Sequence, residues 1–152
     1  MAPAQLTQMF TDLHRFHDQL EAAVEARLVA DCGLALGRYE VLEVISRTDA
    51  CRVNDIADEL AITWGGASKL VDRLEAAQLC TRRPNPDDGR SSLIRLTAAG
   101  KRALTKARKS LDSELDLRVG GVLGQRPLDQ LATALRRLND SAREWDGQRA
   151  AG

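Results

Sequence analysis

Serine, lysine and arginine side chains gather between residues 63 and 91, and these are the side chains that most often bind phosphate oxygens and base edges. When residues 64–77 are placed on a helical wheel, one side is apolar and the other is small and polar. The polar side consists of Gly65, Ser68, Lys69, Asp72, Arg73 and Ala76. This spacing predicts a helix over residues 63–77 whose polar face lies in the major groove of duplex DNA.

The first turn of this helix allows more than one interpretation. Gly65 and Gly66 permit close approach of a partner, and bare backbone amides at a helix start attract phosphate. A helix start also tolerates glycine at small cost, without any contact. Trp64 flanks the polar face and can stack on a sugar, although packing against the preceding helix is the more usual fate of tryptophan. We include Trp64 among the candidate contacts.

The sequence NPDDGRSSLIRLT joins a tight turn to an alternating, strand-like run. A hairpin directly after a groove-binding helix points its tip along the duplex, where Arg90 can enter a narrow minor groove. Asp88 can orient Arg90 or close the turn. Arg82 and Arg83 at the hairpin base, and Ser91 at its shoulder, can hold phosphates. The alternative is a solvated loop with compensating charges, and the position directly after a helix-turn-helix disfavours it.

The elements that position these groups are short helices and one hairpin. Helical periodicity recurs near residues 6–32, 36–45, 54–60, 64–77, 97–122 and 128–138. Two alternating strands flank the turn, near residues 79–83 and 92–96. The predicted fold is mainly α with a small antiparallel β-hairpin, a winged helix-turn-helix. The predicted segments are an N-terminal dimerisation helix (1–33), the winged helix-turn-helix (34–100), C-terminal dimerisation helices (101–146) and a disordered tail (147–152).

Three polar residues stand where helix N-caps are expected, namely Asn54, Thr63 and Thr97. The two outer arms carry apolar stripes that have no place in a small central domain. The stripes consist of Leu6, Met9, Phe10, Leu13, Phe16, Leu20 and Val24, and of Leu128, Leu131, Leu135 and Leu138. Since such stripes are most readily buried against a second copy, we predict a twofold homodimer.

Composition restricts the function further. The 152 residues carry 22 basic and 22 acidic side chains, so any electrostatic footprint must be local. There is no secretory leader pattern and no apolar stretch near the roughly 20 residues of a membrane span, so we expect a soluble, cytoplasmic protein without a membrane partner. No Ser-His-Asp order, phosphate-cradling glycine loop or pair of catalytic carboxylates stands out, so we expect no enzyme activity and no cofactor.

The segments VNDIADELAITWGGASKLVDRLEAAQLCTRR and NPDDGRSSLIRLTAAGKRAL resemble the MarR family of winged-helix transcription regulators. The resemblance implies a homodimer on a pseudo-palindromic operator, usually a repressor, with the wing over residues 84–92 in the minor groove. It places DNA contacts on Thr63, Gly65, Ser68, Lys69, Arg73 and Arg90. Two features depart from the family pattern, namely Gln78, where glycine is common, and the Gly65-Gly66 pair.

The resemblance also implies release from DNA by a small-molecule effector. In this fold a pocket would form where the first two helices and the long fifth helix meet the winged domain, and our lining candidates are His17, Arg38 and Tyr39. A winged helix used only for protein interaction remains an alternative, although the cationic face of residues 64–77 disfavours it.

Oxidant sensing through a cysteine is another alternative, because some relatives use one. Cys32, Cys51 and Cys80 are widely spaced and lack a C-x-x-C pair, which argues against a disulfide framework or a zinc knuckle. A reactive thiol needs nearby positive charge to lower its pKa, and buried, inert cysteines are the default. His14, His17 and Glu21 share a helix face but have no fourth ligand in view, so we predict no metal site.

Overall fold

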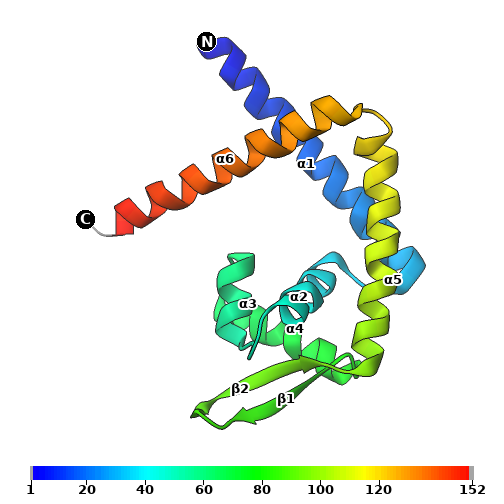
Figure 1. Ribbon diagram of the computed structural model, residues 1–152, viewed down its shortest axis with the longest axis vertical. Helices are drawn as coiled ribbons and strands as arrows, with labels where there is room; N and C mark the ends of the chain where they lie inside the picture. The colour runs from blue at the N-terminus through cyan, green and yellow to red at the C-terminus, as the bar shows by residue number, and fades with distance from the viewer. Residues whose placement is uncertain (1, 151–152) are drawn as a thin grey trace. The chain divides into compact units, whose positions relative to one another are not determined.

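The computed structural model describes the backbone of residues 2–150 and the side chains of residues 2–142. The chain forms two compact units, Met1–Asp112 and Ser113–Gly152. The elements in chain order (Figure 1) are α1 (Pro3–Cys32), α2 (Leu36–Arg47), α3 (Val53–Leu60), α4 (Trp64–Ala76), β1 (Cys80–Asn85), β2 (Asp88–Leu96), α5 (Ala98–Leu115), the π-helical turn η1 (Asp116–Gly120) and α6 (Gln125–Ala150). The predicted mainly helical winged helix-turn-helix with one antiparallel hairpin is confirmed.

Helices α2, α3 and α4 and the hairpin enclose the core of the first unit (Figure 1). Its largest fully buried side chains include Leu28, Leu42, Ile56, Leu74, Ile94, Val41, Val44 and Val71. Helix α4 buries Ala67, Val71 and Leu74 at helical spacing, so its opposite face is turned outward. Ala77, the last residue of the predicted helix, is instead an exposed C-cap because α4 ends at Ala76.

The N-terminus of α3 differs from its prediction. The helix begins at Val53, so Arg52 and not Asn54 is its N-cap residue. The capping bond runs from the backbone N–H of Arg52 to the carboxylate of Asp55, at 2.7 Å. Asn54 and Asp55 are both short polar side chains in the first turn of α3. Asp55, at the third helical position, is the one that accepts the capping bond.

The recognition helix α4 begins as predicted. The Oγ1 atom of Thr63 accepts a hydrogen bond from the backbone N–H of Gly66 at 3.1 Å. This bond satisfies one of the four amides that a helix start leaves unpaired. Thr63 is therefore tied to the helix cap, and only the rest of its surface is free for a partner.

The two strands of the wing pair over a longer stretch than predicted. Antiparallel pairing runs from Cys80 opposite Leu96 to Asn85 opposite Asp88, with an irregularity between Pro84 and Asn85. The backbone N–H of Ile94 donates to the carbonyl of Cys51 at 2.8 Å and ties β2 to the loop that precedes α3. The wing is thus attached to the helical core at its base.

A tight junction joins α4, the hairpin and α5. Thr97 caps α5 by accepting from the N–H of Gly100 at 2.9 Å, and its hydroxyl donates to the carbonyl of Gln78 at 2.7 Å. The N–H of Thr97 donates to the carbonyl of Leu79 at 3.1 Å. Gly100 lies so close to Leu79 that an added Cβ would come within 1.9 Å of its carbonyl oxygen. The glycine in the LT-x-x-G sequence is therefore required by close backbone packing.

Gln78 occupies the left-handed region of backbone space, with φ of 59°. This conformation favours glycine because it is strained for residues that carry a Cβ. We expect Gln78→Gly to raise the free energy of unfolding by about 0.5–1 kcal/mol, since the relieved strain is partly offset by the greater freedom of glycine in the unfolded chain. Urea denaturation of the two proteins measures the difference. Gln78→Ala is the matched control and should bring no gain.

Two polar networks attach α5 to the first two helices. Arg108 donates two hydrogen bonds to Glu43 on α2, at 2.6 and 2.8 Å, and the hydroxyl of Tyr39 donates to the same carboxylate at 2.8 Å. Near the end of α1, Asp31 accepts from Ser110 at 2.8 Å and from Arg27 at 2.6 Å. Bidentate arginine–carboxylate pairs are among the stronger charged contacts in proteins.

The Glu43 network predicts acid sensitivity. Its hydrogen bonds with Arg108 hold the pKa of Glu43 below the usual value. A carboxylate whose pKa is depressed by folding adds stability above its unfolded pKa of about 4.3, and this contribution is lost as the pH falls through the folded pKa. We expect Glu43→Gln to lower the free energy of unfolding by about 1–3 kcal/mol at pH 7 and much less at pH 3.

Urea denaturation at both pH values tests this prediction. Asp58→Asn is the control, because Asp58 is exposed and forms no ion pair within the described residues. An equal loss of stability at pH 7 and pH 3 for Glu43→Gln would show that the carboxylate charge is not what stabilises the contact.

The second unit consists of the end of α5, η1 and α6. Helix α6 begins at Gln125, three residues before the helical periodicity predicted from residue 128, and continues to Ala150. Residues 147–150, predicted to be disordered, are therefore helical, and residues 151–152 lie outside the described part of the chain. Large apolar side chains stay exposed on this unit, including Leu117, Val122, Leu131, Leu135 and Leu138.

Candidate nucleic-acid interface

The outward face of α4 presents free cations. Lys69 and Arg73 are exposed and have no ion-pair partner among the described residues. Ser68 is half-buried beside them, and Gly65 faces open space, because a Cβ built there meets no atom within 4 Å. The fold itself therefore does not require glycine at position 65. A helix face of this kind can approach a phosphate backbone or a base edge closely.

Arg82 lies in a different setting from the other predicted phosphate ligands. Its guanidinium reaches from β1 across α4, where it lies 2.5 Å from Asp72 and 3.3 Å from Glu75. It also donates to the carbonyl of Ser68 at 3.3 Å. Arg82 therefore offsets the two carboxylates that would repel phosphate on the outward side of α4. These contacts hold β1 of the wing against α4, and the phosphate contact of Arg82 stays a prediction.

Side-chain hydrogen bonds order the tip of the wing. The carboxylate of Asp88 accepts from the backbone N–H of Arg90 at 3.0 Å, and Asn85 accepts from the N–H of Asp87 at 3.0 Å. Asn85 also donates to the hydroxyl of Ser91 at 2.9 Å. These Asx-type contacts fix the turn without using the side chain of Arg90. The Arg90 guanidinium is exposed and has no ion-pair partner among the described residues, and the same is true of Arg83 on β1.

A groove between the wing and the helix-turn-helix brings several predicted residues together. This cavity of about 370 Å³ is lined by Trp64, Arg82, Asp88, Arg90 and Ser91, and by Arg52, Val53, Asn54 and Ser92. Trp64 lies at the edge of this groove and is 59% exposed, so it is not packed against the preceding helix as a buried side chain. The sequence did not indicate Arg52 or Asn54 as part of this groove, because both are distant from the wing along the chain and only the tertiary fold brings them beside it.

Two of the three effector-pocket candidates, Tyr39 and His17, differ in exposure. Tyr39 is buried and hydrogen-bonded to Glu43, and this burial raises its pKa. His17 is exposed on α1, 3.3 Å from Asp18. None of the cavities that we describe is lined by His17, Arg38 or Tyr39. Within the described residues, no cluster of three His, Cys, Asp or Glu side chains has metal-binding geometry.

Two of the three cysteines, Cys51 and Cys80, are poorly suited to rapid oxidation. All three are free, and Cys51 and Cys80 are buried. Burial raises the pKa of each of these two thiols to about 11, so both are protonated near neutral pH. Cys32 is half-buried, and its sulfur lies 3.6 Å from the hydroxyl of Ser110. The structure therefore disfavours the oxidant-sensing alternative at Cys51 and Cys80.

Comparison with known proteins gives consistent matches. Residues 34–92 match the model of the MarR family. The HTH-type transcriptional regulator YdgJ of Bacillus subtilis is 24% identical over 86 residues, which cover 57% of this chain and 52% of YdgJ. The chain thus aligns with about half the length of that relative.

Two solved structures share the fold over nearly the whole chain. Sco3205 of Streptomyces coelicolor, a MarR family transcriptional regulator in complex with DNA, has a TM-score of 0.84 at 20% identity, covering 93% of this chain and 94% of that one. The transcriptional repressor CouR, bound to a 23-mer DNA duplex, has a TM-score of 0.80 at 24% identity, covering 91% and 98%. CouR from Rhodococcus jostii RHA1 also matches in a structure bound to p-coumaroyl-CoA.

A helix-turn-helix followed by an ordered wing, with free cations on both, defines a DNA-binding transcriptional regulator of the winged-helix class. Over residues 34–92, the helix-turn-helix and its wing, the chain matches the MarR family of these regulators. Regulators of this family are not enzymes. Within residues 2–150, no helix combines the length and apolar character needed to cross a bilayer.

Proposed function

We propose that the protein is a homodimeric repressor that binds a pseudo-palindromic operator and is released from it by a small-molecule effector. The observation that carries the proposal is a cationic face on α4 together with an arginine at the tip of the wing, neither of which has an ion-pair partner among the described residues. Lys69 and Arg73 lie in the major groove, with Thr63, Trp64, Gly65 and Ser68 along the same side of α4. Arg90 enters the minor groove. Arg83 and Ser91 contact the phosphates that flank the wing.

Exposed apolar side chains support the homodimer. Five large apolar residues in the N-terminal half of α1 are more than 40% exposed in the single chain, namely Leu6, Met9, Phe10, Leu13 and Phe16. Leu131, Leu135 and Leu138 of α6 are exposed as well. Monomeric proteins rarely leave so many apolar side chains at helical spacing in water, so we assign these faces to contact with a second copy. A twofold dimer then sets two α4 helices roughly 34 Å apart, in successive major grooves.

Repression and effector release rest on the known relatives. CouR is a transcriptional repressor by name and has been seen with both DNA and an acyl-CoA ligand. A ligand of this protein would act by favouring a spacing of the two α4 helices that does not fit the operator. Intracellular action on DNA implies a cytoplasmic location.

The charge of Lys69 provides a direct test of the major-groove assignment. A side chain that contacts phosphate contributes about one unit to the slope of log affinity against log salt concentration. We expect Lys69→Gln to weaken binding of operator and scrambled duplex alike, and to reduce that slope by about 1 per contact. Fluorescence anisotropy at several salt concentrations measures both. Arg102→Gln is the matched control, because Arg102 is an exposed cation of α5 outside the proposed interface. A slope unchanged in Lys69→Gln would remove Lys69 from the interface.

A further inference from the structure

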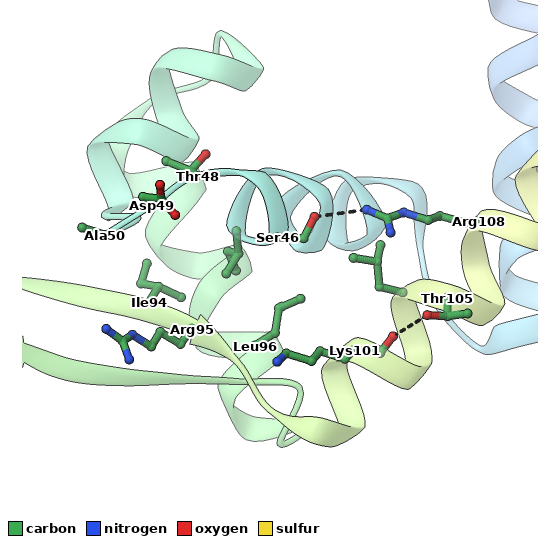
Figure 2. Close-up of a pocket in the computed structure, with 12 residues that line it drawn as sticks. Ser46, Thr48, Asp49, Ala50, Ile94, Arg95, Leu96, Lys101, Thr105 and Arg108 are labelled. Carbon is green, nitrogen blue, oxygen red and sulfur yellow. Dashed lines mark hydrogen bonds between the residues drawn. The ribbon is translucent and has the colours of Figure 1, made fainter.

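A second cavity, of about 490 Å³, lies in the first unit between the end of α2, strand β2 and the first turns of α5. Figure 2 shows Ser46 on α2, Arg95 and Leu96 on β2, and Lys101 and Arg108 on α5 around this space. Its volume falls within the range of roughly 300–1,000 Å³ that is usual for sites of small molecules. The cavity shares no lining residue with the groove beside the wing tip.

The walls combine an apolar floor with a cationic edge. Apolar side chains come from Ile45, Ile94, Leu96 and Leu104, of which Ile45, Ile94 and Leu104 are buried. Hydroxyl groups come from Ser46, Thr48 and Thr105. This mixture suits a ligand that has an apolar body and a polar end.

The cations of this cavity differ in how far they are already neutralised. Arg108 is paired with Glu43 and also donates to Ser46 at 3.1 Å. Arg95 and Lys101 are exposed and form no ion pair with any described residue. A single carboxylate, Asp49, lies among the lining residues. The edge of the cavity therefore carries net positive charge, and two of its cations are free to bind an anion.

We propose that this cavity binds a small amphipathic anion, with its carboxylate held by Arg95 and Lys101 and its apolar body over Ile94 and Leu104. Its lining does not include His17, Arg38 or Tyr39, the effector-pocket candidates from the sequence. The cavity is also directly connected to the wing, because β2 forms one of its walls. Ile94, Arg95 and Leu96 belong to the strand that carries Arg90 at its other end, and the N–H of Ile94 ties that strand to Cys51. An occupant thus contacts the base of the wing and, given the proposed function, shifts its position on DNA.

The binding test uses the full chain without DNA and 2-naphthoate as the probe, with neutral 2-naphthamide as its matched analogue. Isothermal titration calorimetry should show that naphthoate binds more tightly than naphthamide. The double variant Arg95→Gln/Lys101→Gln should weaken naphthoate by about tenfold and leave naphthamide unchanged. Thr105→Trp should block both by filling the cavity. Arg102→Gln is the control, as a neighbouring cation that does not line the cavity, and should bind naphthoate as the wild type does.

Equal affinity for the charged and neutral probes would overturn the proposal, and so would wild-type naphthoate binding by the double variant. A double variant that loses DNA affinity while it keeps naphthoate affinity would assign the two cations to DNA instead. A separate arm adds naphthoate to the DNA complex, where it should weaken wild-type binding but not binding by the double variant. If the protein binds no DNA, the proposed function fails. The calorimetric result then still shows whether the cavity binds the anion.

Discussion

Gly100→Ala should lower the free energy of unfolding by about 3 kcal/mol, at the upper end of the cost of overpacking a close-packed site. The added methyl group would lie 1.9 Å from the carbonyl oxygen of Leu79 and 2.9 Å from its carbonyl carbon. Both atoms belong to the backbone, so no side-chain rotation can relieve the clash. The first turn of α5 must move away from Leu79, and the hydrogen bonds of Thr97 to this junction would then be strained.

Gly65→Ala is the matched control for this substitution, because a Cβ at position 65 meets open space. Its stability should equal or slightly exceed that of the wild type, since alanine is the better helix former. Urea denaturation of the three proteins gives the comparison. A wild-type midpoint for Gly100→Ala would mean that α5 does not pack against Leu79 as closely as described.

Arg90→Ala should weaken operator binding by about 1–3 kcal/mol and leave the stability of the protein unchanged. The stability is preserved because the wing turn is held by Asp88, Asn85 and Ser91, and the exposed guanidinium of Arg90 forms no ion pair within the described residues. The affinity falls because an arginine in a narrow minor groove meets concentrated negative potential. Fluorescence anisotropy with an A·T-rich flank at the wing position should show the largest loss.

Arg90→Lys separates charge from shape at this position. Lysine keeps the positive charge but lacks the planar guanidinium, so we expect an affinity between those of the wild type and Arg90→Ala. If all three proteins bind one duplex equally, Arg90 does not enter the groove, and the wing serves another purpose.

Periodicity alone predicted most of the fold. The spacing of Ala67, Val71 and Leu74 places one face of α4 inward, and the three- and four-residue steps in α1 locate its apolar stripe. Thr63 and Thr97 were recognised as caps because a capping bond is local, spanning three residues. The unusual Gln78 was noticed in the sequence as a departure, and its φ of 59° explains why glycine is favoured there.

Tertiary pairing is what the sequence could not reveal. The neighbours of Arg82 in the sequence favour a phosphate ligand. They do not indicate that its guanidinium pairs with Asp72 and Glu75 of α4. Likewise, the sequence does not indicate that the hydroxyl of Tyr39 donates to Glu43, which in turn binds Arg108, 65 residues away. The cavity bounded by Arg95 and Lys101 is also formed by segments distant in sequence, so no spacing rule indicates it.

The central claim is that α4 and the wing bind a specific operator as part of a dimer. The most direct measurement is fluorescence anisotropy of the full chain on the duplex just upstream of its own gene, at several salt concentrations, with a scrambled duplex as reference. We expect selective, salt-sensitive binding with two chains per duplex. Equal affinity for the native and scrambled duplexes at every salt concentration would contradict binding at this site, and one chain per duplex would contradict the dimer.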